Sequence, residues 1–232
     1  MTLSFLLVAC GGDEGASQEG TNESEGTEES DSGSNETTDE NAAPEIEPDT
    51  WRFITEEVDG QVQYVYAEEF AKRINEKTEG AITVEPYEYG GLGSEVDQVG
   101  QLQDGAVELA IMSPGFTGNM VQEGQIFALH FLFPDSVETT QEILNTSEAL
   151  NTDLRARYEE HNISPLAFWT EGATQWTSNK GLQEPADFEG FQMRVQESPL
   201  MMRSYEAYGA SPQALSWSEL YTALDRGTVE GQ

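Results

Sequence analysis

Residues 190–232 read GFQMRVQESPLMMRSYEAYGASPQALSWSELYTALDRGTVEGQ, and this stretch decides how the whole chain is interpreted. Residues 191–195 alternate apolar and polar side chains, which is typical of a strand with one buried face. A Ser-Pro pair at 198–199 then supplies a helix cap and a first-turn proline, and Gly209 supplies a stop. A second helix is expected at 218–226. This alternation of strand and helix predicts an α/β unit.

Arg194 is the residue of this stretch that points to a function. Phe191, Met193 and Val195 share one face of the expected strand, so the Arg194 side chain projects from the other face. A guanidinium offers a planar fork that pairs with a carboxylate through two parallel hydrogen bonds. The alternative is a solvated arginine on an open sheet face. Because basic residues are scarce here and both faces of a sheet in an α/β protein are usually covered, we favour carboxylate binding.

The chain before this stretch follows the same alternation. Strands are expected at 51–54, 81–85 and 107–112. Between them, helices are expected at 66–74 and after Ser94, a cap residue with an aspartate three positions later. The pattern predicts a parallel or mixed sheet that is covered by helices.

Apolar runs in the centre of the chain, between residues 127 and 178, predict one helix and two strands. The run at 127–133 ends at a proline, and one long helix is expected at 136–160. Two strands are expected next, at 163–169 and 175–178, and the second of them could cross between two lobes. The sequence contains no internal repeat and no Gly-rich phosphate loop.

The chain is strongly acidic, and its N-terminal part differs from the rest in composition. Of 232 residues, 44 are Asp or Glu and 10 are Lys or Arg, which gives a formal net charge of −34. Residues 11–49 hold fourteen of the acids, no basic or aromatic residue and one large aliphatic residue, Ile46. Such a segment cannot bury enough apolar area to fold and is predicted to be a disordered tether. The other 30 acids still outnumber the 10 bases, which excludes nucleic acid as a partner because backbone binding needs clustered Lys and Arg.

Cys10 is the one cysteine, and it follows an apolar run and precedes two glycines and the tether. This order resembles a bacterial lipobox, in which the cysteine is lipidated and becomes the mature N-terminus. Residues 1–10 are therefore predicted to be a truncated lipoprotein signal peptide, and the lipid on Cys10 to anchor the protein to a membrane. The alternative is a free cysteine at a frayed terminus.

Catalytic and metal sites find little support in the sequence. The two histidines, His130 and His161, have no nucleophile nearby in sequence and are expected to be structural. Carboxylates are abundant, but no spacing singles out an acid–base pair. Cys and His spacings typical of metal sites do not occur, so we predict no catalytic residue, no metal ligand and no cofactor.

Several short blocks occur in a fixed order: GLGS at 91–94, QLQDGA at 101–106, GFQMRV at 190–195, GASP at 209–212 and ELYTAL at 219–224. Together they resemble the solute-binding proteins of TRAP transporters, the DctP-like family, over about residues 51–232. The resemblance implies a two-lobed, periplasmic-binding-protein-like α/β fold, with a first lobe at 50–171 and a ligand-binding second lobe at 172–232. It also implies a family chain that continues past Gln232, so we expect a C-terminally truncated fragment with an incomplete second lobe.

The resemblance assigns roles to two residues. Arg194 would be the carboxylate-binding arginine, and Trp217 stands where the family often places a ring against the ligand. For Trp217 the alternative is a core residue at a helix start. Sialic-acid-binding members are similar but carry a second arginine where this chain has Thr174, which argues against sialic acid.

Further candidates come from positions near the ends of expected strands, where open α/β sheets collect ligands. For each of them the alternative is an exposed loop residue. They are Gln175, Trp176 and Asn179 before Arg194, and Glu56, Gln63, Met112, Ser113 and Phe116 near the first and third strands.

The expected function is that of an extracytoplasmic, lipid-anchored receptor. It would capture a small organic anion, a carboxylate or dicarboxylate, between two lobes and deliver it to the membrane subunits of a TRAP transporter. No bond is made or broken in this process, so the protein is not expected to be an enzyme. Two alternatives stay open: a ligand sensor for a signalling partner, and a lipoprotein hydrolase that uses His130 or His161.

Overall fold

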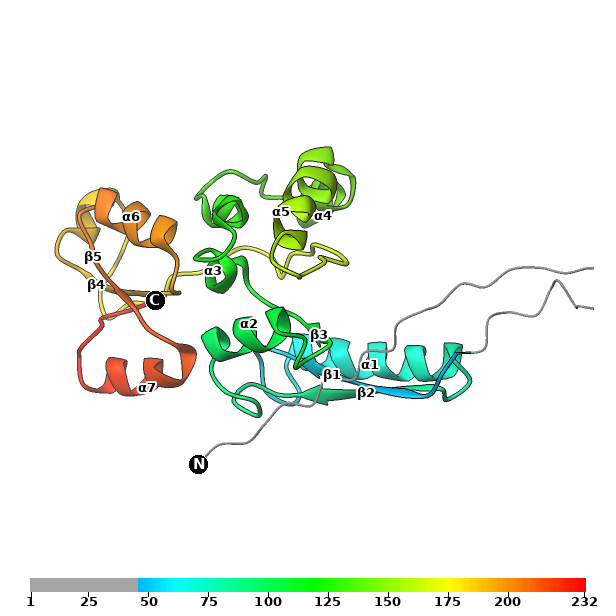
Figure 1. Ribbon diagram of the computed structural model, residues 1–232. Helices are drawn as coiled ribbons and strands as arrows, with labels where there is room; N and C mark the ends of the chain where they lie inside the picture. The colour runs from blue at the N-terminus through cyan, green and yellow to red at the C-terminus, as the bar shows by residue number, and fades with distance from the viewer. Residues whose placement is uncertain (1–45) are drawn as a thin grey trace, which may run out of the picture. The chain divides into compact units, whose positions relative to one another are not determined.

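The computed structural model describes residues 46–232 of the chain (Figure 1). The predicted lipidation site Cys10 and residues 11–45 of the predicted tether lie outside the described residues. Within residues 46–232, no helix is long and apolar enough to cross a membrane.

The first sheet follows the predicted alternation. Three parallel strands lie in the order β2-β1-β3. Parallel neighbours need a crossover connection, and a helix supplies each crossover here. The elements are β1 (Asp49–Ile54), α1 (Val62–Lys77), β2 (Ile82–Tyr87), α2 (Glu95–Gln103) and β3 (Leu109–Ala110). β1 begins at Asp49, a residue that the sequence assigned to the tether, because its backbone pairs with β2 from that point.

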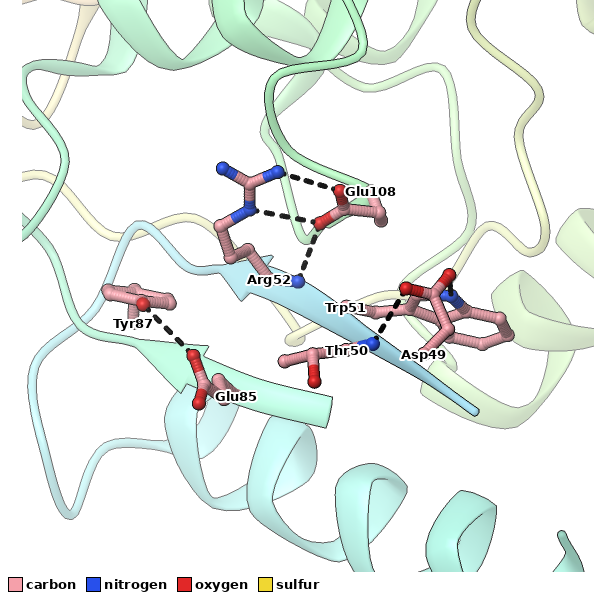
Figure 2. Close-up of polar contacts among 7 residues, drawn as sticks. All are labelled: Asp49, Thr50, Trp51, Arg52, Glu85, Tyr87 and Glu108. Carbon is pink, nitrogen blue, oxygen red and sulfur yellow. Dashed lines mark hydrogen bonds and ion pairs between the residues drawn. The ribbon is translucent and has the colours of Figure 1, made fainter. Parts of the chain in front are cut away.

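A side chain replaces backbone pairing just before β3. Glu108 accepts hydrogen bonds from the backbone N–H of Arg52 (2.7 Å) and from its guanidinium Nη2 (2.8 Å), as Figure 2 shows. Only Leu109 and Ala110 pair with β1, so the predicted strand at 107–112 is too long. The Arg52 guanidinium lowers the pKa of the Glu108 carboxyl. Both side chains are partly exposed, and pairs of this kind stabilise a fold only slightly.

The helices next to the first sheet pack and begin as the sequence predicts. α1 packs on β1 and β2 through the buried residues Phe53, Ala67, Ile82 and Val84. α2 begins with the predicted capping box: the Ser94 hydroxyl accepts the Asp97 N–H, and the Asp97 carboxylate accepts the Ser94 N–H (3.0 Å).

The prediction of one long helix at 136–160 is wrong, because the helix is interrupted. The chain forms α4 (Val137–Thr146), the π-helical η2 (Ala149–Leu154) and α5 (Arg155–Glu159), preceded by the short α3 (Pro114–Thr117) and the 3₁₀-helix η1 (Gln122–Ala128). The break lies at Ser147, whose ψ of 120° is not helical. The Asn151 side chain donates to the Leu144 and Ser147 carbonyls, which satisfies backbone acceptors at the break.

The predicted strand at 163–169 does not form in the described chain. Ile163 and Phe168 instead pack against a helical cluster made by Val121, Leu144, Leu150, Leu154 and Tyr158. The apolar run that suggested a strand is therefore explained by packing on helices.

The second sheet is formed within residues 190–232. Its two strands run parallel and are joined by a helix. The elements are η3 (Pro185–Phe188), β4 (Gln192–Val195), α6 (Pro199–Ala207), β5 (Ser211–Ala214) and α7 (Trp217–Asp225). β4 and both α-helices were predicted, and Ser198 caps α6 as expected. β5 was not predicted, since proline is uncommon in strands. Pro212 fits there because β5 pairs only with β4 in the described sheet.

Residues 230–232 lie between β4 and residues 177–179. The Arg194 N–H donates to the Gly231 carbonyl (2.8 Å), and Thr177 and Gln232 exchange two backbone hydrogen bonds (2.9 and 3.0 Å). The predicted strand at 175–178 is thereby reduced to an isolated bridge between Ser178 and Gly231. The core of this sheet is formed by Phe188, Phe191, Met193, Val195, Tyr205 and Ala210.

Candidate ligand-binding site

Arg194 lies on the face of β4 opposite this core, as predicted. It is partly buried, so the alternative of a fully solvated arginine does not hold. Its Nε donates to the Leu215 carbonyl (3.0 Å) and its Nη1 to the Gln232 side-chain oxygen (3.4 Å). Among residues 46–232, no carboxylate lies within 4.0 Å of this guanidinium. The site therefore holds a cation that is anchored but has no direct carboxylate partner among the described residues.

The surroundings of Arg194 act on its charge in two directions. Burial lowers the pKa of Arg194, and the nearby Glu95, Tyr89 and Glu56 raise it. A partly desolvated cation is stabilised when a carboxylate bonds to it directly. The guanidinium has five N–H donors, and two of its nitrogens are occupied as described above, so donors remain for such a partner.

Gly231 and Gln232 complete this part of the site, and neither was among the predicted site residues. A Cβ at Gly231 would collide with the Thr177 carbonyl and lie 2.9 Å from the Phe191 ring. Glycine thus lets the backbone pass between two neighbours and brings the Gln232 side chain to Arg194. A glycine in a strand is a known signal of close backbone approach, but its partner could not be known from the sequence.

Trp217 begins α7 and remains 46% exposed, so it is not the core residue that was weighed as its alternative. Its ring meets the Tyr89 ring edge-on, with centroids 5.2 Å apart. Its backbone N–H donates to the buried Glu95 carboxylate (3.0 Å). Neither Tyr89 nor Glu95 was predicted as a site residue. A glutamate in the first turn of a helix is usually a solvated partner of the helix dipole.

Glu56, Gln63 and Ser113, three of the predicted residues, come together beyond the ends of β1 and β3. The Glu56 carboxylate accepts the Ser113 N–H (2.9 Å) and the Ser113 hydroxyl. The Glu56 N–H donates to the Gln63 side-chain oxygen (3.0 Å), and the Gln63 amide nitrogen donates to Glu171 (3.0 Å). The three residues thus gather beyond the carboxyl ends of parallel strands, and their role in ligand binding stays a prediction.

The charge state of Glu56 is unusual. Desolvation raises the pKa of Glu56 to about 7, with smaller contributions in the same direction from Glu95 and Glu171, while the Ser113 hydrogen bonds act against it. At neutral pH this carboxyl is therefore close to half protonated. A cation placed beside it would favour the ionised form.

The remaining predicted residues do not converge on Arg194. Trp176 packs on Phe188 and donates to the Tyr205 hydroxyl (2.8 Å), on the core face of the second sheet. The Asn179 side chain donates to Glu230 (3.4 Å) at the end of that sheet. Gln175 and Met112 make no side-chain hydrogen bond to Arg194 in the described chain. Phe116 is buried in α3, with 6% of its surface exposed.

The predicted structural role of His130 agrees with its packing. Its Nδ1 lies 2.8 Å from the Tyr208 hydroxyl, and its ring stacks on the Tyr208 ring. Burial lowers the pKa of His130. No group of three or more His, Cys, Asp or Glu residues that could hold a metal ion occurs within residues 46–232.

Comparison with known proteins decides the family. The family model DctP, described as bacterial extracellular solute-binding protein, family 7, matches residues 53–232. The chain belongs to this family. As a family 7 protein it is similar to the ectoine-binding periplasmic protein TeaA of Halomonas elongata, with 34% identity over 184 residues, 79% of this chain and 53% of TeaA.

Two further relatives are named for different solutes. The ectoine/5-hydroxyectoine-binding periplasmic protein UehA of Ruegeria pomeroyi is 32% identical over 82% of this chain and 56% of UehA. The C4-dicarboxylate-binding periplasmic protein DctP of Rhodobacter capsulatus is 33% identical over 71% of this chain and 49% of the relative.

The solved structure of TeaA shares the fold of this chain, with a TM-score of 0.76 over 79% of this chain and 59% of TeaA. The predicted two-lobed α/β fold of periplasmic binding proteins is thereby confirmed. The chain spans about half the length of the curated relatives that it matches.

Proposed function

We propose that this protein is an extracytoplasmic receptor that binds a small carboxylate-bearing solute between two lobes and delivers it to the membrane subunits of a TRAP transporter. The observation that carries this function is Arg194, a partly buried guanidinium that is held by Leu215 and Gln232 and has no carboxylate partner within residues 46–232. Membership of family 7 supports it. The receptor makes and breaks no covalent bond, so it is not an enzyme.

A zwitterionic solute suits this site better than a dicarboxylate. Glu56 and Glu95 lie close enough to Arg194 to raise its pKa. The second carboxylate of a dicarboxylate would be repelled by these groups, whereas a cationic group would be attracted. Ectoine carries one carboxylate and one amidinium cation, and two relatives are named for binding it. Glu56, held by Ser113, would face such a cation.

Binding would proceed by closure around the ligand. Arg194 would pair with the solute carboxylate through two parallel hydrogen bonds, and the exposed ring of Trp217 would cover its carbon skeleton. Closure of the lobes would exclude water and strengthen the ion pair, because Coulomb attraction grows as the local dielectric constant falls.

Calorimetric titration tests this function. Wild type should bind ectoine more tightly than succinate, and Arg194→Ala should lose binding while its circular dichroism spectrum stays that of wild type. If wild type binds neither probe nor any other small carboxylate, the proposed function fails. If it prefers succinate, the receptor function stands and the zwitterion preference fails.

The lipid anchor at Cys10 stays part of the proposed function, since it would keep the receptor at the membrane that holds the transporter. Expression of wild type and Cys10→Ala in a bacterial host, followed by mass spectrometry of the mature protein, tests it. Wild type should carry the mass of a lipid on Cys10, and the variant should lack it. An unmodified wild-type Cys10 would remove the anchor from the proposed function.

A further inference from the structure

Two side chains of the first lobe contact the beginning of α7 in the second lobe. The Trp217 N–H donates to Glu95 Oε1 (3.0 Å), across 122 residues of sequence. The Ser218 N–H donates to the Tyr89 hydroxyl oxygen (3.1 Å), across 129 residues. The Tyr89 hydroxyl in turn donates to Glu95 Oε2 (3.2 Å), so the four residues form one connected network.

Glu95 is the centre of this network. It is 2% exposed, although a carboxylate at the start of a helix is ordinarily solvated. Each of its oxygens accepts a hydrogen bond from the network, which offsets the cost of burying it. Loss of the α7 contact would leave one carboxylate oxygen buried without this donor.

α7 does not need Glu95 in order to begin. Ser216 and Glu219 form a capping box within the helix itself, where the Ser216 N–H donates to Glu219 (3.3 Å). Glu95 bonds a different group, the N–H of the first helical residue. The contact therefore adds attachment between lobes rather than local helix stability.

Glu95 and Arg194 hold the same short segment from two sides. Arg194 Nε donates to the Leu215 carbonyl, and Glu95 accepts the N–H of Trp217, two residues later. The edge-on contact between the Tyr89 and Trp217 rings also fixes the tryptophan side chain. The position of Trp217 relative to Arg194 thus depends on a residue of the first lobe.

We propose that Glu95 is a positioning residue of the ligand site: together with Tyr89 it ties the start of α7 to the first lobe and holds Trp217 over the solute bound at Arg194. The part of this role that concerns the ligand rests on the function proposed above. When the contact is lost, the lobes separate more readily and the solute leaves faster, whereas encounter with the open site is little affected.

Hydrogen exchange measured by NMR tests the attachment without any ligand. The variants are Glu95→Ala, which removes the acceptor, and Glu95→Gln, which keeps an acceptor oxygen and loses the charge; Glu219→Gln is the matched control on the same helix. In Glu95→Ala the Trp217 and Ser218 amides should exchange about tenfold faster or more, and in Glu95→Gln the increase should be smaller. Glu219→Gln should leave the Trp217 amide protected. Unchanged exchange of Trp217 in Glu95→Ala would overturn the inference.

Stopped-flow dissociation of ectoine, or of succinate if wild type binds that probe, tests the role in binding. Glu95→Ala should release the probe about tenfold faster with a similar association rate, and Glu95→Gln should be intermediate. Equal dissociation rates in wild type and both variants would overturn the positioning role. Failure of wild type to bind either probe would instead count against the proposed function, while the exchange experiment would still decide whether Glu95 ties the lobes together.

Discussion

Replacing Glu56 by glutamine should remove a pH dependence of stability that the fold imposes on this residue. Glutamine is close in shape to a protonated glutamic acid, and its side-chain oxygen can still accept the Ser113 N–H that Glu56 accepts in the wild type. The glutamine amide can donate to the Ser113 hydroxyl, which in the wild type donates to Glu56, so the substitution keeps both contacts with Ser113 and removes the ionisable group.

The magnitude follows from the pKa of Glu56. Desolvation raises this pKa to about 7 in the folded protein, from an ordinary value of 4.5. Because the folded pKa is the higher one, the contribution of Glu56 to the free energy of unfolding is complete below about pH 4.5 and is lost as the pH rises through 7. The difference corresponds to about 3 kcal/mol between the two limits.

Urea unfolding of wild type and Glu56→Gln at several pH values, without ligand, measures this quantity. Near pH 4 the two proteins should be almost equally stable, near pH 5 the variant should be more stable by about 1 kcal/mol, and near pH 8 by about 3 kcal/mol. Taking the difference between the proteins cancels the titration of the acidic residues that do not interact with Glu56. Glu76→Gln, on the exposed face of α1, is the matched control and should show no such rise. A difference between wild type and Glu56→Gln that stays flat from pH 5 to pH 8 would refute the desolvation of Glu56.

Three other substitutions test separate parts of the structure. Arg194→Lys should weaken binding of the solute found for wild type by at least about 2 kcal/mol in calorimetry, because an ammonium cannot form two parallel hydrogen bonds; binding equal to wild type would contradict the fork geometry. Gly231→Ala should lower the free energy of unfolding by about 2 kcal/mol or more, since the new Cβ meets the Thr177 carbonyl, whereas the control Gly100→Ala in α2, with nothing within 4 Å of the added Cβ, should not destabilise the protein. Ser94→Ala should cost about 1 kcal/mol in urea unfolding through loss of the capping box, and an unchanged midpoint would show that the box contributes nothing.

Local patterns in the sequence were reliable where the physics is local. Ser94 and Asp97 are three residues apart, so their capping box depends on little beyond the first turn of α2. The long helix predicted at 136–160 failed because the pattern of apolar residues continued through Ser147 while the backbone did not. Its apolar side chains are buried by packing between short helices, which a single periodicity does not reveal.

Contacts between residues far apart in the sequence account for most of the site residues that were wrongly placed. Trp176 was expected near Arg194, but residues 177–179 pair with 230–232, and this register turns Trp176 toward the core of the second sheet. A shift by one residue in pairing would reverse the faces, so the segment alone could not settle the direction of this side chain.

The sequence by itself determined the family blocks, the α/β class and the side of β4 on which Arg194 lies. That side follows from the strand period alone, because successive side chains of a strand point to opposite faces. Only the tertiary structure decided that Arg194 has Gln232 beside it, that Glu95 is buried against Trp217, and that Glu56 is desolvated. These features depend on contacts between residues far apart in sequence, and burial and charge are properties of the surroundings that folding brings together.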